Sequence, residues 1–214
     1  MASITRLFDF LINIDTHLAE LLQLYGVWTY CILFLVVFCE TGLVVAPFLP
    51  GDSLLFIIGA LGASGDVDFP IALVILTIAA ISGNTLNYFI GRLIGDRVLK
   101  KRKTRLIKKE HLEKAHLFYE KHGGKAIIIS RFLPVLRTFT PFAAGISKMN
   151  FIKFFSYNLI SGTVWVLVFM FGGRFFGNIP LVKDNFYYVI LGIFVVSLLP
   201  ALITYIRTRI LKSV

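Results

Sequence analysis

Long apolar blocks with few internal charges dominate the hydrophobic pattern of this chain. Three of them, residues 70–91, 151–173 and 186–206, are each long enough to cross a bilayer as one helix, which takes roughly 18 or more apolar residues. None of these blocks shows the strict alternation that marks a half-buried strand. The pattern therefore predicts an all-α membrane protein in which residues 1–214 form a single membrane domain.

Two further apolar segments, 27–65 and 126–147, are interrupted by prolines and charged residues. An interrupted segment makes a poor spanning helix, but it suits a re-entrant hairpin that is buried in protein. We expect the hairpins to break at Pro47, Pro50 and Gly51 in the first segment and at Pro134 and Pro141 in the second.

The basic residues are concentrated in one place. Residues 92–125 hold twelve Lys or Arg and four Asp or Glu, which accounts for most of the net charge of +10. Such a run also suits nucleic-acid binding, but the chain is 57% apolar and only 16% charged. The positive-inside bias of membrane proteins is the simpler explanation, so we predict a cytoplasmic loop containing a short helix and no nucleic-acid partner. Residues 1–25 mix apolar and acidic side chains and predict an amphipathic helix at the membrane surface.

Counting the crossings gives a topology. The basic C-terminal tail should lie with loop 92–125 on the cytoplasmic side. Because spans 151–173 and 186–206 already carry the chain out and back, segment 126–147 must enter and leave from the cytoplasm, and segment 27–65 from the opposite side. Two opposed broken hairpins, each followed by a span, predict an inverted repeat. In transporters, such repeats place the substrate site near the middle of the membrane.

Four ionisable residues fall inside apolar segments: Glu40, Asp52, Arg131 and Arg137. Each costs about 2.5–3.5 kcal/mol at the centre of an isolated membrane helix, so the four need compensation. Because two acids balance two bases, we predict that the hairpin tips meet and that these charges face each other or a wet cavity. Two alternatives stay open: a purely structural lock between the four, and snorkelling of Arg137 to the interface.

The residue types at these positions favour transport chemistry. Arginine grips a phosphate through two parallel hydrogen bonds, so Arg131 and Arg137 are candidates to bind a phosphate headgroup. Burial raises the pKa of a carboxylate whereas a nearby arginine lowers it, so Glu40 and Asp52 are candidates for proton coupling or gating.

Two asparagines and the absence of ligand clusters complete the candidate chemistry. Asn84 and Asn87 share one helix face and could line a cavity, although hydrogen bonding between helices is their ordinary role. The histidines and cysteines lack the spacing of metal ligands, so we expect neither a metal nor a cofactor. A membrane phosphatase of the acid-phosphatase type would need a histidine nucleophile, and Arg131 has no histidine partner within the membrane segments, so we do not expect an enzyme.

At these same residues the sequence resembles the DedA family, also called SNARE-associated or VTT-domain proteins. FCETGLVVAPFLPGDSLLFIIGAL at 38–61 is similar to the acidic first hairpin of that family. GGKAIIISRFLPVLRTFTPFAAGIS at 123–147 is similar to its arginine hairpin, with R, two residues, P, two residues and R. The resemblance extends from about residue 10 to residue 206.

The resemblance implies a multi-pass protein of the bacterial inner membrane with two opposed re-entrant hairpins. It implies movement of lipids between leaflets, undecaprenyl phosphate or a phospholipid included, and a proton-dependent role in membrane homeostasis. By motif match, Glu40 and Asp52 are its acidic pair, and Arg131 and Arg137 its phosphate-binding pair. A proton-coupled transporter of small ions or drugs, and an assembly factor that transports nothing, remain as alternatives. No oligomeric state follows from the sequence.

Overall fold

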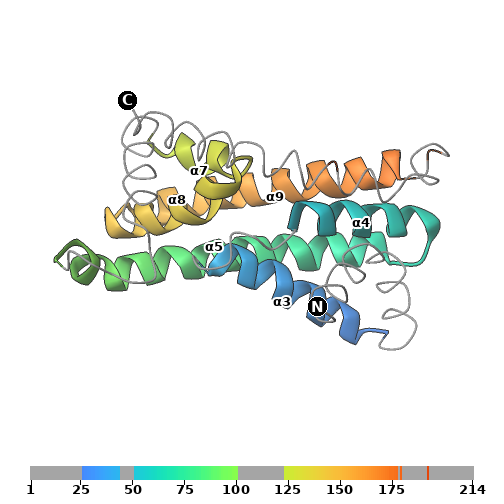
Figure 1. Cartoon of the computed structure of the whole chain (residues 1–214), viewed down its shortest axis with the longest axis horizontal. Helices are drawn as coiled ribbons and strands as arrows, with labels where there is room; N and C mark the ends of the chain where they lie inside the picture. The colour runs from blue at the N-terminus through green and yellow to red at the C-terminus, as the bar shows by residue number, and fades with distance from the viewer. Residues whose placement is uncertain (1–25, 44–50, 101–122, 178, 180–191, 193–214) are drawn as a thin grey trace, which may run out of the picture.

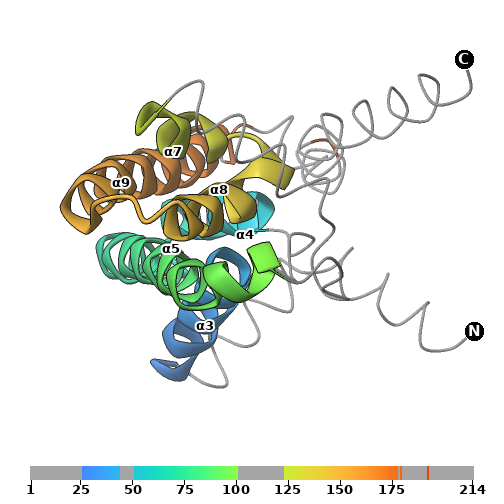
Figure 2. The same cartoon turned by 90° about the vertical axis from the view of Figure 1, so that its left-hand side faces the viewer.

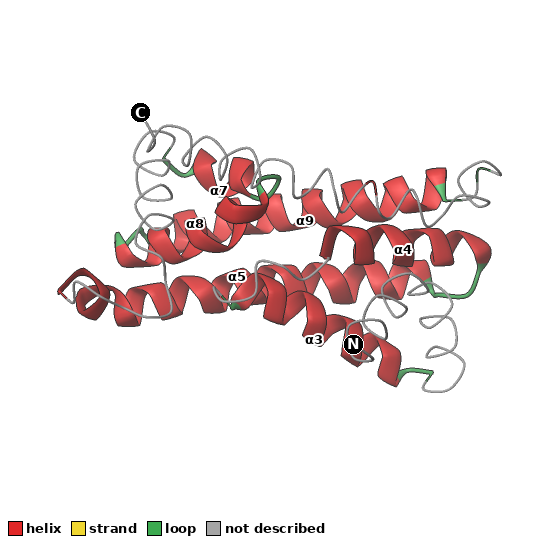
Figure 3. Ribbon diagram, viewed as in Figure 1, coloured by secondary structure: helices red, strands yellow, loops and turns green. Residues whose placement is uncertain are grey.

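A computed structural model describes residues 26–43, 51–100, 123–177, 179 and 192. All regular secondary structure in these ranges is helical (Figure 3). The helices are α3 (Trp28–Gly42), α4 (Gly51–Ser64), α5 (Phe69–Lys100), α7 (Lys125–Ser130), α8 (Pro134–Ile146) and α9 (Phe151–Phe176).

Two long antiparallel helices, α5 and α9, run through the length of the molecule (Figure 1). The short helices α8 and α4 lie toward opposite ends of this pair. When the molecule is viewed from one end, α3 lies outside α5 and α7 lies outside α9 (Figure 2). The shorter helices of the broken segments therefore pack on a scaffold formed by α5 and α9.

In each half of the chain, α3–α5 and α7–α9, one short helix packs against the long helix of the other half. Helix α4 packs mainly against α9 of the other half, and α8 packs mainly against α5. Helices α3 and α7, in contrast, pack on the long helix of their own half. An inverted repeat would produce this reciprocal pattern, so the packing favours that prediction. The repeat and the re-entrant course of the hairpins remain predictions.

Glycines allow the exchanged helices to approach backbone to backbone. A side chain at Gly59 of α4 would collide with the carbonyl of Met170, and one at Gly173 of α9 would collide with the carbonyl of Phe56. Small residues have this role in membrane helix interfaces generally. The α5–α8 pair repeats the contact in both directions, at Gly91 with Phe142 and at Gly145 with Tyr88.

Local sequence explains where the long helices begin. The Asp68 carboxylate accepts a hydrogen bond from the backbone N–H of Ile71 at 3.0 Å, which caps the first turn of α5. Asn150 caps α9 in the same way and accepts from the N–H groups of Ile152 and Lys153. Each cap satisfies backbone donors that have no partner within the helix.

Both long helices can span a membrane by length and composition, at Phe69–Leu93 and Phe151–Phe176. Helix α5 continues to Lys100, beyond the end predicted at Gly91, so the first residues of basic segment 92–125 are helical rather than loop. Its extension lacks proline and is rich in Leu, Arg and Lys, which favour helix. Apolar side chains exposed on the outer face of α5 suit contact with lipid: Ile71, Val74, Ile78, Leu86, Phe89 and Leu93.

Several predictions concern residues outside the described ranges. These are the surface helix at 1–25, the span at 186–206, the breaks at Pro47 and Pro50, and the short helix within the basic segment. The prediction that Pro141 breaks the second hairpin is wrong, because Pro141 lies inside α8. A proline removes only one hydrogen bond from a helix, and packing of α8 on α5 can offset that loss.

Candidate functional site

The two broken segments bring three of the four predicted charges into direct contact. Arg137 of α8 donates through Nη1 to Oδ1 of Asp52 at 2.8 Å, and its Nη2 forms an ion pair with Oε1 of Glu40. Glu40 lies near the C-terminus of α3 and Asp52 in the first turn of α4. All three residues are buried, at 8% exposure or less. One cation therefore meets two anions inside the bundle, so the three contacting groups carry a net charge of −1 when all are ionised.

Glu40 also caps the N-terminus of α4. The backbone N–H of Gly51 donates to Oε1 of Glu40 at 3.3 Å. A side chain at Gly51 would collide with this carboxylate, so glycine is needed for the close approach. The backbone N–H of the first described residue of α4 is thus bound to a carboxylate of the protein itself.

Trp165 of α9 contacts one of the acids and both arginines of the site. Its indole Nε1 donates to Oδ1 of Asp52 at 2.9 Å, the same oxygen that accepts from Arg137. The guanidinium carbons of Arg131 and Arg137 lie 5.4 Å and 5.7 Å from its ring centroids. Such distances permit cation–π attraction, which is strongest for tryptophan. With 1% exposure, Trp165 is buried at the centre of the site rather than at an interface.

Arg131, the fourth predicted charge, is held differently. It follows the last turn of α7 and donates through Nη2 to the carbonyl of Ala80 at 3.1 Å and to Oδ1 of Asn158 at 3.0 Å. Gly162 leaves space for the guanidinium, because a Cβ there would lie 3.1 Å from Nη2. Its hydrogen-bond partners among the described residues are therefore neutral, although the side chain is only 2% exposed.

Asn158 is the centre of a polar network between α5 and α9. Its Oδ1 accepts from Asn84 at 3.1 Å as well as from Arg131. Its Nδ2 donates to the carbonyl of Ile81 at 2.9 Å and to the hydroxyl of Thr85 at 3.2 Å. Asn158 is fully buried, so this complete set of bonds fixes the amide orientation and, with it, the position of Arg131.

Asn87 of α5 connects the two broken segments. Its Nδ2 donates to the carbonyl of Thr41 in α3 at 3.2 Å and to the carbonyl of Thr138 in α8 at 2.7 Å. Asn84 and Asn87 therefore make hydrogen bonds between helices, which is the ordinary role expected for them. Both lie beside the charged residues.

Some polar atoms of the site keep unused bonding capacity. Within the part of the chain that the structure describes, six buried side-chain atoms lack a hydrogen-bond partner: Glu40 Oε2, Asn87 Oδ1, Arg131 Nε, Arg137 Nε, Thr138 Oγ1 and Thr140 Oγ1. Buried polar atoms are rarely left without partners in folded proteins, so such a group points to strain or to a function. Here the atoms belong to the charged residues or to neighbours along α5 and α8.

The sequence identified the charged residues of the site but missed two neutral ones, Trp165 and Asn158. A signal for them exists: Asn158, Ser161, Gly162 and Trp165 recur at helical spacing within the apolar span 151–173, and all are buried in α9. A polar and small stripe on an apolar helix predicts a face turned toward protein rather than lipid.

The VTT domain matches residues 49–175 of the chain. This range includes most of the site described above, from Asp52 to Trp165. The chain belongs to the DedA family. It is 52% identical over 205 residues to Protein DedA of Escherichia coli strain K12, a similarity that covers 95% of this chain and 94% of that protein.

Two other relatives are named as membrane proteins. Inner membrane protein YqjA of Escherichia coli K12 is 37% identical over 71% of this chain and 69% of its own length. An uncharacterised membrane protein of Mycobacterium tuberculosis H37Rv is 42% identical over 81% of this chain and 77% of its own length. No solved structure gives a significant match. The chain is thus a membrane protein of the DedA family, and the names of its relatives support an inner-membrane location.

Proposed function

We propose that this protein moves a phosphate-bearing lipid, such as undecaprenyl phosphate or a phospholipid, between the leaflets of the inner membrane. The observation that carries the proposal is the unequal pairing of two buried arginines: Arg137 is bound by two carboxylates, whereas Arg131 has neutral hydrogen-bond partners. In this proposal Arg131 is the cation that can pair with an incoming anion. Arg137 can do so only after one of its carboxylate partners is released.

Charge balance suggests how a phosphate is accepted. Glu40, Asp52, Arg131 and Arg137 sum to zero when all are ionised, so an added phosphate leaves an uncompensated negative charge in a buried place. Such a charge is costly unless it is paired. Protonation of Glu40 or Asp52 removes one negative charge. It also weakens one of the two ion pairs of Arg137, so one side of that guanidinium can bind phosphate instead. Phosphate binding and proton uptake then occur together, which couples the two movements.

The geometry requires an opening motion. All four charged side chains are 8% exposed or less, so a headgroup reaches them only after α3–α4 or α7–α8 moves relative to the long helices. Within this scheme Arg131 makes the first contact with the phosphate and Arg137 the second, while the acyl chain stays in lipid. No covalent step is involved, in keeping with a transporter rather than an enzyme.

Transport measured in each leaflet of proteoliposomes tests these roles. We expect Arg131→Lys and Arg137→Ala each to lower the initial rate for a phosphate-bearing lipid by about tenfold or more, because lysine cannot make the two parallel hydrogen bonds of arginine and alanine removes the cation. Arg174→Ala is the matched control, since this arginine is exposed at the end of α9 and lies over Phe69, outside the site. Unchanged transport in both site variants would refute the assignment.

Asn158→Asp separates anion binding from a structural lock. The new carboxylate lies where Asn158 Oδ1 now accepts from Arg131, so it offers that arginine a negative partner of almost the same shape. If Arg131 binds phosphate, transport falls; thermal stability falls in either case, because the variant loses the two hydrogen bonds that Asn158 Nδ2 donates. If the charges only lock the fold, transport is unaffected. Proton-driven flux of a small ion without lipid movement would support the alternative transporter instead.

A further inference from the structure

A second polar feature lies at one end of the long helices, away from the buried charges. It is an open cavity of about 480 Å³ lined by Arg92, Lys148, Met149, Asn150, Phe151 and Ile152. These residues come from α5 and from the turn between α8 and α9. Of the lining residues that the structure describes, two are basic and none is acidic, and this positive charge attracts anions.

Arg92 is held in position at this cavity. Its Nη1 donates to the hydroxyl of Tyr88 at 3.0 Å, and that hydroxyl donates to the carbonyl of Met149 in the turn. A guanidinium has five N–H donors, so the one bond that Arg92 makes to the described side chains leaves others to bind an anion. Lys148 adds a second cation on the same turn, at a left-handed backbone angle of φ 52°. That conformation ordinarily favours glycine, and here it carries a basic side chain.

Aromatic and apolar side chains surround the basic cavity. Phe151 lies 5.2 Å from Phe89 and 5.7 Å from Phe155 between ring centroids. Leu93 and Ile152 are among the most exposed large apolar residues described, at 79% and 75%. Cations beside aromatic and exposed apolar residues mark the level of the lipid headgroups. An anion bound in this cavity therefore has an apolar surface next to it.

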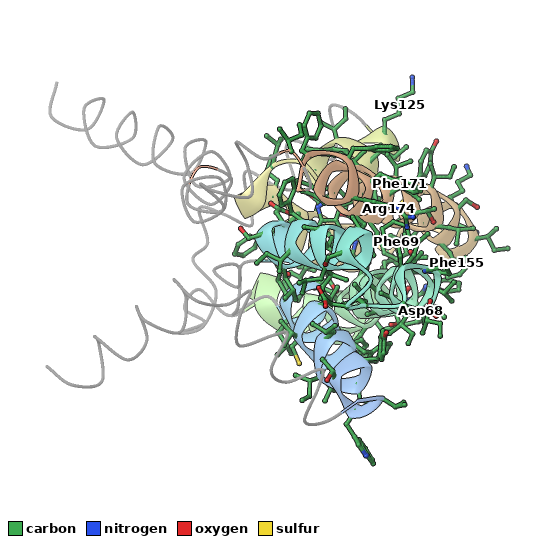
Figure 4. All side chains as sticks on the ribbon, turned by 90° about the vertical axis from the view of Figure 1, so that its right-hand side faces the viewer. Asp68, Phe69, Lys125, Phe155, Phe171 and Arg174 are labelled. Carbon is green, nitrogen blue, oxygen red and sulfur yellow. The ribbon has the colours of Figure 1, made fainter. Side chains whose placement is uncertain are left out.

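We propose that this cavity binds the phosphate of an anionic phospholipid, with the acyl chains against Leu93, Ile152 and Phe155. Figure 4 shows Phe155 extending from the outer side of the bundle, where a chain can reach it. The apolar border makes a lipid the better ligand than a free phosphate, since it adds buried apolar area to the charge attraction.

The proposed lipid site lies close to the buried charges along α5. Arg92 is eight residues beyond Asn84, a rise of about 12 Å along the helix axis. A lipid bound here would lie at the end of the bundle nearest to α7 and α8. The inference does not require transport, because binding at this cavity can be measured by itself.

Native mass spectrometry in detergent tests the proposal with phosphatidylglycerol as the probe. We expect the double variant Arg92→Gln with Lys148→Gln to bind this lipid about tenfold more weakly or worse, because two charge-assisted contacts are lost. Lys125→Gln is the control, since Lys125 is exposed at the start of α7 and extends away from the bundle (Figure 4). Equal affinity in the double variant and the wild type would overturn the proposal.

Lys148→Gly keeps the test valid if the double variant does not fold. Glycine suits the positive φ at this position, so we expect the variant to be at least as heat-stable as the wild type while binding phosphatidylglycerol more weakly. Two probes distinguish the ligand sources. Equal binding of neutral phosphatidylcholine, or displacement of the lipid by equimolar inorganic phosphate, would overturn the assignment to an anionic lipid.

Discussion

Arg131 and Arg137 are both buried but differ in the partners that hold them. Arg137 pairs with two carboxylates that belong to the other broken segment, whereas Arg131 donates to a backbone carbonyl and to the Asn158 amide. Removing one partner of a buried ion pair leaves a charge without compensation, which costs more than the pair contributes when intact. The two arginines should therefore respond differently to substitution.

Arg137→Gln should lower the free energy of unfolding by about 3–5 kcal/mol, because two buried carboxylates lose their cation. Chemical unfolding in detergent, followed by circular dichroism, measures the loss. Arg174→Gln provides the comparison: its guanidinium lies 4.5 Å from the Phe69 ring on the exposed end of α9. That contact is worth at most about 1 kcal/mol at an exposed site. Similar losses in the two variants would contradict the buried ion-pair assignment.

Among the elements, the exchanged helices α4 and α8 determine how the halves fit together. Each lies on the long helix of the opposite half, with glycine against carbonyl in both directions. In a membrane the helices gain little from the hydrophobic effect, so close backbone packing contributes more of their association energy. Glycines at these crossings should consequently be far less tolerant than their neighbours.

Adjacent glycines of α9 allow a matched comparison. Gly173→Ala would place a Cβ against the Phe56 carbonyl, and we expect a loss of about 1–3 kcal/mol from overpacking. At Gly172 the nearest atom to an added Cβ is 3.9 Å away, so Gly172→Ala should be neutral or gain up to about 1 kcal/mol of helix propensity. Thermal unfolding of both variants in one detergent gives the comparison. Equal effects would show that α4 does not pack on α9 as described.

For the whole molecule, the open prediction is the direction in which each broken segment enters the membrane. The antiparallel long helices and the reciprocal packing of α4 and α8 favour opposed hairpins (Figure 1). If α7–α8 is re-entrant, its two ends lie on one membrane face, and the α4–α5 turn lies on the other.

Cysteine labelling with a membrane-impermeant maleimide can test this topology. After replacement of Cys31 and Cys39, we expect single cysteines at Lys125 and Ser147 to react in inverted vesicles and not in intact cells. A cysteine at Asp66 should show the reverse. All three positions are exposed, so access depends on the side of the membrane. Reaction of Lys125 and Ser147 variants from opposite sides would mean that α7–α8 crosses the membrane.

The sequence by itself determined the class of the protein, the long helices and the four buried charges. These follow from local properties: apolar runs long enough to span a bilayer, and ionisable side chains in apolar surroundings. It also overestimated one local effect, since Pro141 lies within α8 rather than at a break. A proline's effect on a helix depends on the packing around it, which the local sequence does not specify.

Only the tertiary structure decided which acid meets which base. Arg137 binds Asp52 and Glu40 across 85 and 97 residues of chain, and these pairs exist because α4 and α8 pack against the opposite halves. The same exchange brings Trp165 to Asp52 and leaves Arg131 with Asn158. Charge counting gives the sum of the four residues, whereas their pairing depends on where the helices cross.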